Sequence, residues 1–118
     1  MSNIHVKTAA INLRRAVNDL ETERKQLEAD LSKQLKDIDS KRNNLSYLEK
    51  QRIGKISQTD DQAAQTQSLV MAERMHNESK DLENQIAQIK NEASQRTASI
   101  DSQIASYSGL ANQLEMQA

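Results

Sequence analysis

The sequence predicts an all-α fold, an antiparallel two-helix coiled-coil hairpin that assembles into a dimeric four-helix bundle or a higher oligomer. Three observations predict this fold. The 118 residues contain no proline, apolar residues recur three and four apart along nearly the whole chain, and this periodicity lapses once near the middle. Such spacing places apolar side chains on one narrow face of a helix. A stripe of this width packs against another helix, because it is too narrow to cover a globular core.

The first helix is expected from about residue 4 to residue 53. Its apolar stripe consists of Leu13, Val17, Leu20, Leu27, Leu31, Leu35, Ile38, Leu45 and Leu48. Three arginines, Arg24, Arg42 and Arg52, also fall on the stripe, where an arginine can lay its stem along the apolar surface and carry its charge to water. The step from Leu27 to Leu31 to Leu35 inserts four residues into the heptad pattern, and such a stutter locally unwinds a supercoil.

A turn is expected at about residues 54–60. Gly54 is predicted to close the first helix in a left-handed turn, which glycine adopts without steric cost. Thr59 and Gln62 are spaced as a capping box, in which Thr59 accepts a bond from the Gln62 N–H and the Gln62 side chain returns one. One continuous helix is the alternative, because a single glycine costs only ~1 kcal/mol inside a helix.

The second helix is expected from about residue 60 to residue 116, so that residues 1–118 form a single hairpin. Its apolar stripe consists of Met75, Leu82, Ile86, Ile89, Ala93, Ile100, Ile104, Tyr107, Ala111 and Leu114. Ser79 and Arg96 are its predicted polar members, and a second stutter follows Arg96. Polar residues on such a stripe can set the register and oligomer state of a coiled coil.

The two halves of the chain carry opposite net charge, which favours their antiparallel pairing. Residues 1–56 hold twelve Lys and Arg against eight Asp and Glu, a net charge of +4. Residues 57–118 hold four against nine, a net charge of −5. The sequence leaves the register of the two helices open. One alignment puts Leu13 opposite Tyr107, and shifts of one heptad in either direction match the apolar layers equally well.

The composition describes a rod with a large surface relative to its buried seam. Only 36% of the residues are hydrophobic and 2% are aromatic, whereas a compact domain uses large rings to fill its core. Disorder of the isolated chain is the competing interpretation. The regular Leu and Ile stripe and the net charge of −1 argue against it. The absence of cysteine excludes disulfides and thiolate chemistry.

No residue cluster predicts catalysis, a cofactor or a metal site, so we do not expect an enzyme. Glu73 and His76 form a single Glu-x-x-His motif, but helix-bundle metal sites need two such motifs and further inward carboxylates. Nucleic-acid binding is not expected, because acids alternate with the basic residues of the first helix. Membrane attachment is not expected either, although the acid-free segment 1–18, with Lys7, Arg14 and Arg15, leaves weak contact with an anionic surface open.

The leading functional hypothesis is a non-enzymatic structural or interaction protein that acts by self-association. The stretch from Thr97 to Ala118 is rich in small residues and contains only two charged ones, Asp101 and Glu115. Low charge and small side chains favour helix docking, so the open end of the hairpin is the expected partner interface. The interface residues are predicted to be Leu13, Val17, Leu20, Ile100, Ile104, Tyr107, Gly109, Ala111 and Leu114.

An alternative hypothesis is a binding module of the secretion-system or chaperone type, which engages a client protein through the open end. The expected partner is a second copy of the chain, or else another helical protein. We expect a cytoplasmic location, because the sequence shows no signal peptide and no apolar run of about 20 residues. Secretion by a route that needs no signal peptide stays open.

Overall fold

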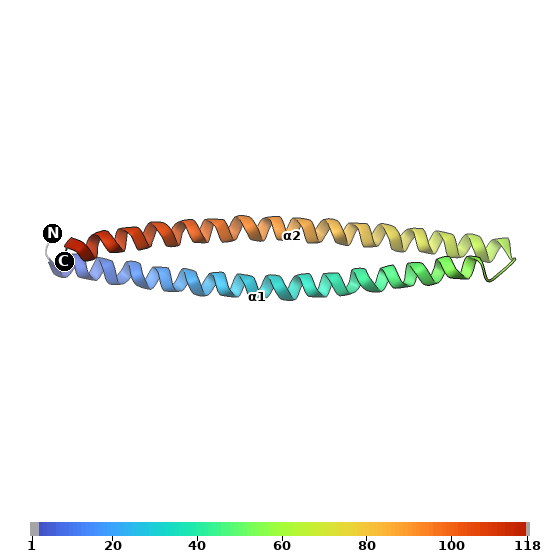
Figure 1. Cartoon of the computed structure of the whole chain (residues 1–118), viewed down its shortest axis with the longest axis horizontal. Helices are drawn as coiled ribbons and strands as arrows, with labels where there is room; N and C mark the ends of the chain where they lie inside the picture. Colours follow the sequence, from blue (N-terminus) through green and yellow to red (C-terminus); the bar gives the residue numbers. More distant parts are fainter. Residues whose placement is uncertain (1–2, 118) are drawn as a thin grey trace. The chain divides into compact units, whose positions relative to one another are not determined.

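Two long α-helices form a helical hairpin, as predicted. The structure is a computed structural model that describes residues 3–117; α1 spans Asn3–Ile56 and α2 spans Gln62–Gln117. The chain follows α1, reverses over residues 57–61 and returns along α2 (Figure 1). The described residues contain no β-strand. The alternative of one continuous helix is therefore wrong.

The hairpin divides into two compact units. Unit 1 is made of Met1–Leu31 and Asn91–Ala118, and so pairs the beginning of α1 with the end of α2. Unit 2 is Ser32–Lys90, which contains the rest of both helices and the turn. The boundary between the units crosses each helix where successive seam residues are four apart. These residues are Leu27, Leu31 and Leu35 on α1 and Ile89, Ala93 and Thr97 on α2.

In unit 1 the seam is built from small and medium-sized aliphatic residues. The residues that bury their side chains most completely are Val6, Ala10, Val17, Ala93, Ile100 and Ala111. Their three- and four-residue spacing keeps them on one face of each helix. Because three of these residues are alanines, the backbones of α1 and α2 can approach closely, and each contact covers little area.

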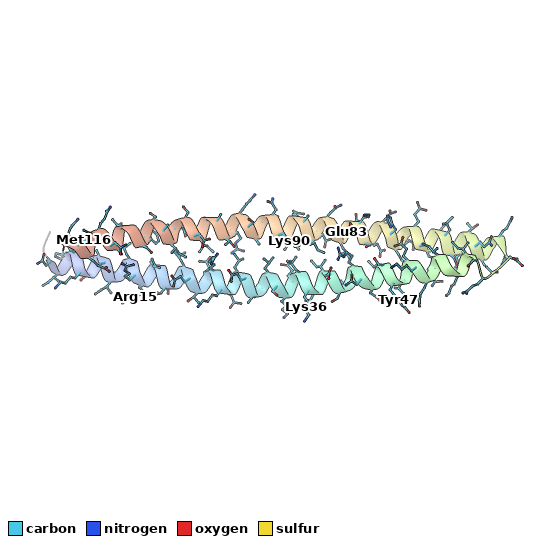
Figure 2. All side chains as sticks on the ribbon, viewed as in Figure 1. Arg15, Lys36, Tyr47, Glu83, Lys90 and Met116 are labelled. Carbon is cyan, nitrogen blue, oxygen red and sulfur yellow. The ribbon has the colours of Figure 1, made fainter. Side chains whose placement is uncertain are left out.

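In unit 2 the seam is more polar. The buried residues here are Ala72, Ser79 and Ser68, the last at the limit of burial with 9% of its surface exposed. Arg42 and Arg52 are half-buried on the facing stripe of α1, as expected for arginines that lay their stems along the seam. Side chains on the outer face of α1 stand away from α2, as Lys36 and Tyr47 do in Figure 2.

Arg96 is not a seam residue, contrary to the sequence-based prediction. Arg96 is exposed, whereas the next residue, Thr97, is half-buried. The stutter of α2 therefore runs from Ile89 through Ala93 to Thr97, in steps of four. The sequence alone favoured Arg96 because Thr97 is neither large nor aliphatic, but the small hydroxyl side chain is the one that meets α1.

Gly54 does not end α1, so the prediction of a glycine stop is wrong. The helix continues to Ile56, and no described glycine has a positive φ. The chain leaves α1 through a bond from the Gln58 N–H to the Lys55 carbonyl, 3.1 Å long, and the Ser57 hydroxyl donates to the Gly54 carbonyl at 2.9 Å. These bonds satisfy carbonyls at the helix end, which a helix terminus otherwise leaves unpaired.

The residue that caps α2 is Asp61, and the predicted capping box of Thr59 and Gln62 does not form. The Asp61 carboxylate accepts a bond of 3.0 Å from the Ala63 N–H, and its carbonyl accepts the first helical bond, 2.9 Å, from the Gln65 N–H. Thr59 Oγ1 instead accepts from the Asp61 N–H at 3.2 Å. The Gln65 side chain donates to the carbonyls of Ile56 and Thr59, which ties the turn to both helices.

The register is settled by two contacts between α1 and α2. Arg24 pairs with Asp101 in unit 1, and Glu49 contacts His76 in unit 2. The alignment with Leu13 opposite Tyr107 would have placed Arg24 beside Arg96, with like charges together. The observed pairs lie nearest to the alignment shifted by one heptad toward the C-terminus, in which Arg24 faces Gln103.

Candidate interaction surface

The residues predicted as a partner interface all belong to unit 1, where most of them contribute to the seam of the hairpin itself. Val17, Ile100 and Ala111 are buried, with 7%, 6% and 0% of their surface exposed. Gly109 is exposed. The remaining five are half-buried: Leu13, Leu20, Ile104, Tyr107 and Leu114. Most of these residues therefore pack between the two helices of the same chain. The half-buried ones keep part of their surface in contact with water.

Unit 1 also exposes large apolar side chains that the seam pattern does not predict. The exposed fractions are 75% for Ile4, 58% for Ile11, 47% for Leu110 and 87% for Met116. Ile4 and Ile11 are seven residues apart and so share one line along α1. This line is out of phase with Val6 and Val17. The seven-residue spacing of Ile4 and Ile11 is present in the sequence, but it is a weaker pattern than the three- and four-residue periodicity of the seam.

An ion pair at one edge of unit 1 joins Arg14 of α1 to Glu115 of α2. Arg14 Nε lies 3.0 Å from Glu115 Oε1, and Arg14 Nη2 lies 3.1 Å from Oε2, so the guanidinium holds both carboxylate oxygens. Arg14 also donates to the Asn112 side-chain oxygen. The hydrogen bonds from Arg14 lower the pKa of Glu115 and, reciprocally, raise the pKa of Arg14.

A second arginine of α1 holds the other acid near the end of α2. Arg24 Nε lies 2.9 Å from Asp101 Oδ1, although its N–H is not aligned for a hydrogen bond. Arg24 also lies 3.7 Å from Glu28 on its own helix. Asp101 and Glu115 are the only charged residues after Arg96. Both are therefore occupied by contacts within the chain, which supports the predicted role of charge in pairing the halves.

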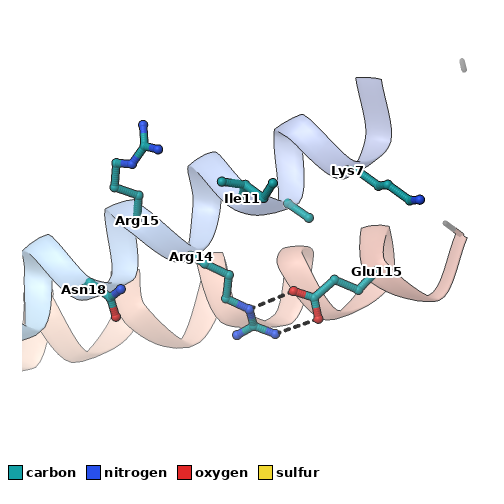
Figure 3. Close-up of a pocket in the computed structure, with 7 residues that line it drawn as sticks. Lys7, Ile11, Arg14, Arg15, Asn18 and Glu115 are labelled. Atoms are coloured by element: carbon teal, nitrogen blue, oxygen red, sulfur yellow. Dashed lines mark hydrogen bonds and ion pairs between the residues drawn. The ribbon is translucent and has the colours of Figure 1, made fainter. Parts of the chain in front are cut away.

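A groove of about 510 Å³ runs along this edge of unit 1. It is lined by Lys7, Ala10, Ile11, Arg14, Arg15, Asn18 and Glu115. In Figure 3 the Arg14 side chain points toward α2 and meets Glu115, whereas Arg15 points away from α2. The lining combines an exposed aliphatic side chain with three cations and a single carboxylate. That carboxylate is already held by Arg14.

The Glu-x-x-His motif lies in unit 2, where its histidine contacts a different acid. His76 Nδ1 lies 3.1 Å from Glu49 Oε1, so the histidine bridges to α1 and contributes to helix pairing. The Glu49 side chain is 22% exposed. Within residues 3–117, no group of three or more His, Asp or Glu side chains is placed to hold a metal ion. The histidine of the motif thus serves as a contact between the helices.

Comparisons with known proteins do not assign the chain to a family. No family model, no curated protein and no solved structure matches it. In the described part of the chain, neither helix has a stretch long and apolar enough to cross a membrane.

Proposed function

We propose that this chain is a non-enzymatic structural protein that works by associating with further copies of itself. The observation that carries this proposal is the incompleteness of the seam. None of the described residues with a large side chain is fully buried, and the buried hydrophobic set consists of Val, Ala and a single Ile. A seam of this kind stabilises a lone hairpin weakly, and association adds stability by mass action.

The surface area supports the same proposal. The chain exposes 8605 Å². A compact monomer of 13.3 kDa exposes about 6,500 Å². The five half-buried residues of the predicted interface and Leu110, which is 47% exposed, are apolar surface that a second copy can cover. Few charges oppose this contact after Arg96, because Asp101 and Glu115 are paired with α1.

Light scattering coupled to size-exclusion chromatography tests the proposal. We expect a stable homo-oligomer at micromolar concentration that dissociates on dilution. Leu110→Lys should shift the equilibrium toward the monomer, because it places a charge on the proposed contact surface of unit 1. Leu69→Lys is the matched control, since Leu69 is similarly exposed at 56% but belongs to unit 2. A folded monomer at every concentration would overturn self-association and favour the client-binding hypothesis.

A further inference from the structure

The groove of unit 1 has an electrostatic character that the seam does not explain. Its α1 wall comes from the segment 1–18, which contains no Asp or Glu. Three cations line it, Lys7, Arg14 and Arg15, together with one carboxylate, that of Glu115. Arg14 and Glu115 neutralise each other across the two helices. The groove therefore retains two positive charges, from Lys7 and Arg15.

These two cations are available to a ligand. Neither Lys7 nor Arg15 forms an ion pair with another described residue, and both side chains are exposed. Ile11 lies between them in the sequence and is 58% exposed. Lys7 and Arg15 are eight residues apart, which corresponds to about 12 Å along a helix. An apolar contact point is thus flanked on both sides by positive charge.

We propose that this groove binds an acidic amphipathic helix of another protein. The complementary helix carries two carboxylates about two turns apart, which pair with Lys7 and Arg15, and an aliphatic residue midway between them that packs on Ile11. A third helix in contact would bury more of the Ile11 side chain, and an amphipathic helix that lays its apolar face in a groove is a common mode of peptide recognition. The interaction differs from self-association, because it uses the charged edge of unit 1.

The small amount of exposed apolar surface at the site favours a helix over an anionic membrane. A bilayer surface binds an outward apolar face, which in interfacial helices is usually rich in Trp, Phe and Leu. The chain has no Trp and no Phe. Of the two apolar side chains that line the groove, Ala10 is only 4% exposed and Ile11 is 58% exposed. One aliphatic side chain offers far less apolar surface than an interfacial helix presents to a bilayer.

Fluorescence anisotropy with a synthetic peptide tests the proposal on the full chain. The probe is a fluorescein-labelled, terminally blocked peptide of about 20 residues, long enough for helix formation. Glu, Leu and Glu stand at intervals of four residues in an Ala and Gln background. The matched control peptide has both Glu replaced by Gln. We expect the acidic peptide to bind about tenfold more tightly than the control, and the difference to shrink as salt screens the charges.

Variants of the chain locate the binding site. The double variant Lys7→Glu/Arg15→Glu should weaken peptide binding about tenfold or more. The control, Lys33→Glu/Lys36→Glu, changes the net charge equally at two exposed lysines of unit 2, and it should leave binding within about twofold. Ile11→Ser should also weaken binding, whereas Ile53→Ser, at a similarly exposed isoleucine, should not. Circular dichroism of each variant should be unchanged.

Three outcomes would overturn the proposal. The first is equal affinity for the Glu and Gln peptides, and the second is equal loss of binding in the site and control variants. The third is binding to vesicles that contain phosphatidylserine, abolished by Lys7→Glu/Arg15→Glu, with no binding of the acidic peptide. That last result would assign the groove to a lipid surface.

Discussion

Asp61 shows how one side chain determines where a helix begins. Four residues near the turn were suited to capping α2, namely Ser57, Thr59, Asp60 and Asp61. Asp61 is the cap, because its carbonyl accepts the first helical hydrogen bond, from the Gln65 N–H. Its carboxylate also accepts a hydrogen bond from the Ala63 N–H. The negative charge is stabilised by the positive end of the helix dipole.

Replacing Asp61 should therefore destabilise the hairpin more than replacing its neighbour. We expect Asp61→Ala to lower the free energy of unfolding by about 1 kcal/mol, because the Ala63 N–H loses its partner. Asp60→Ala removes the same charge from the neighbouring position. Because that position does not accept the Ala63 N–H bond, the substitution should cost less than about 0.5 kcal/mol. Urea denaturation followed by circular dichroism measures both values. Equal effects of the two substitutions would contradict the assignment of the cap.

The Arg14–Glu115 pair predicts a pH dependence of known sign. Because Arg14 lowers the pKa of Glu115, the folded chain holds the carboxylate charged at a pH where the unfolded chain begins to protonate it. The stabilisation is complete above the ordinary carboxyl pKa of 4.5. It is lost as the pH falls through the lower pKa of the folded state. Both side chains are largely solvated, so the effect on stability is small.

Carbon-detected NMR titration of the Glu115 carboxyl group measures this shift directly. We expect a midpoint below the ordinary value in the native chain and a return toward it in Arg14→Gln. Arg15→Gln is the control, because Arg15 points away from Glu115 (Figure 3). The same Glu115 midpoint in all three proteins would show that the pair does not form in solution.

At the scale of the helix, Gly54 and Gly109 are residues that α1 and α2 tolerate rather than require. Neither has a positive φ, and a Cβ added at either position would meet no atom within 4 Å. Glycine inside a helix loses more conformational entropy on folding than alanine does. The continuation of α1 to Ile56 therefore occurs against a local cost that helix packing and the turn bonds offset.

Gly54→Ala should stabilise the protein, which the glycine-stop hypothesis would not allow. In a helical position without a steric conflict, the substitution should raise the free energy of unfolding by about 0.5–1 kcal/mol. Gly109→Ala is a matched comparison in α2 and should act in the same direction. Differential scanning calorimetry at one protein concentration measures both. Destabilisation by Gly54→Ala alone would mean that residue 54 adopts a left-handed conformation in solution.

At the scale of the whole molecule, the seams of the hairpin bury little apolar surface. The seams of both units rely on Ala, Ser and half-buried Leu and Ile residues, with arginine stems between them. Hydrophobic stabilisation follows the apolar area removed from water, and small seam residues remove little of it. The self-association proposed above would remove more of it.

The melting temperature should consequently rise with protein concentration. If oligomers are the folded species, a hundredfold dilution lowers the apparent melting temperature by several degrees, because dissociation favours the unfolded chain. Circular dichroism at 222 nm in cells of different path length measures this. Leu110→Lys should melt at lower temperature and with a weaker concentration dependence than Leu69→Lys. A melting temperature that does not change on dilution would show that the hairpin is stable alone.

The sequence by itself determined the helices, the reversal near residue 60 and the face that each helix turns to its partner. These features follow from local chemistry: absent proline, three- and four-residue apolar spacing, and polar turn residues. The charge imbalance of the halves also indicated antiparallel pairing, and Arg14–Glu115 and Arg24–Asp101 are contacts of the expected sign.

Only the tertiary structure decided the register, the capping residue and the place of Thr97 in the seam. Shifting one heptad stripe against the other by seven residues still aligns apolar layers, so periodicity alone does not choose between the alternatives. They differ in specific contacts such as Arg24 with Asp101. The groove of unit 1 depends on the same choice, because Glu115 must lie beside Arg14 to form its second wall. Such contacts join residues far apart in the chain, and local periodicity carries no information about them.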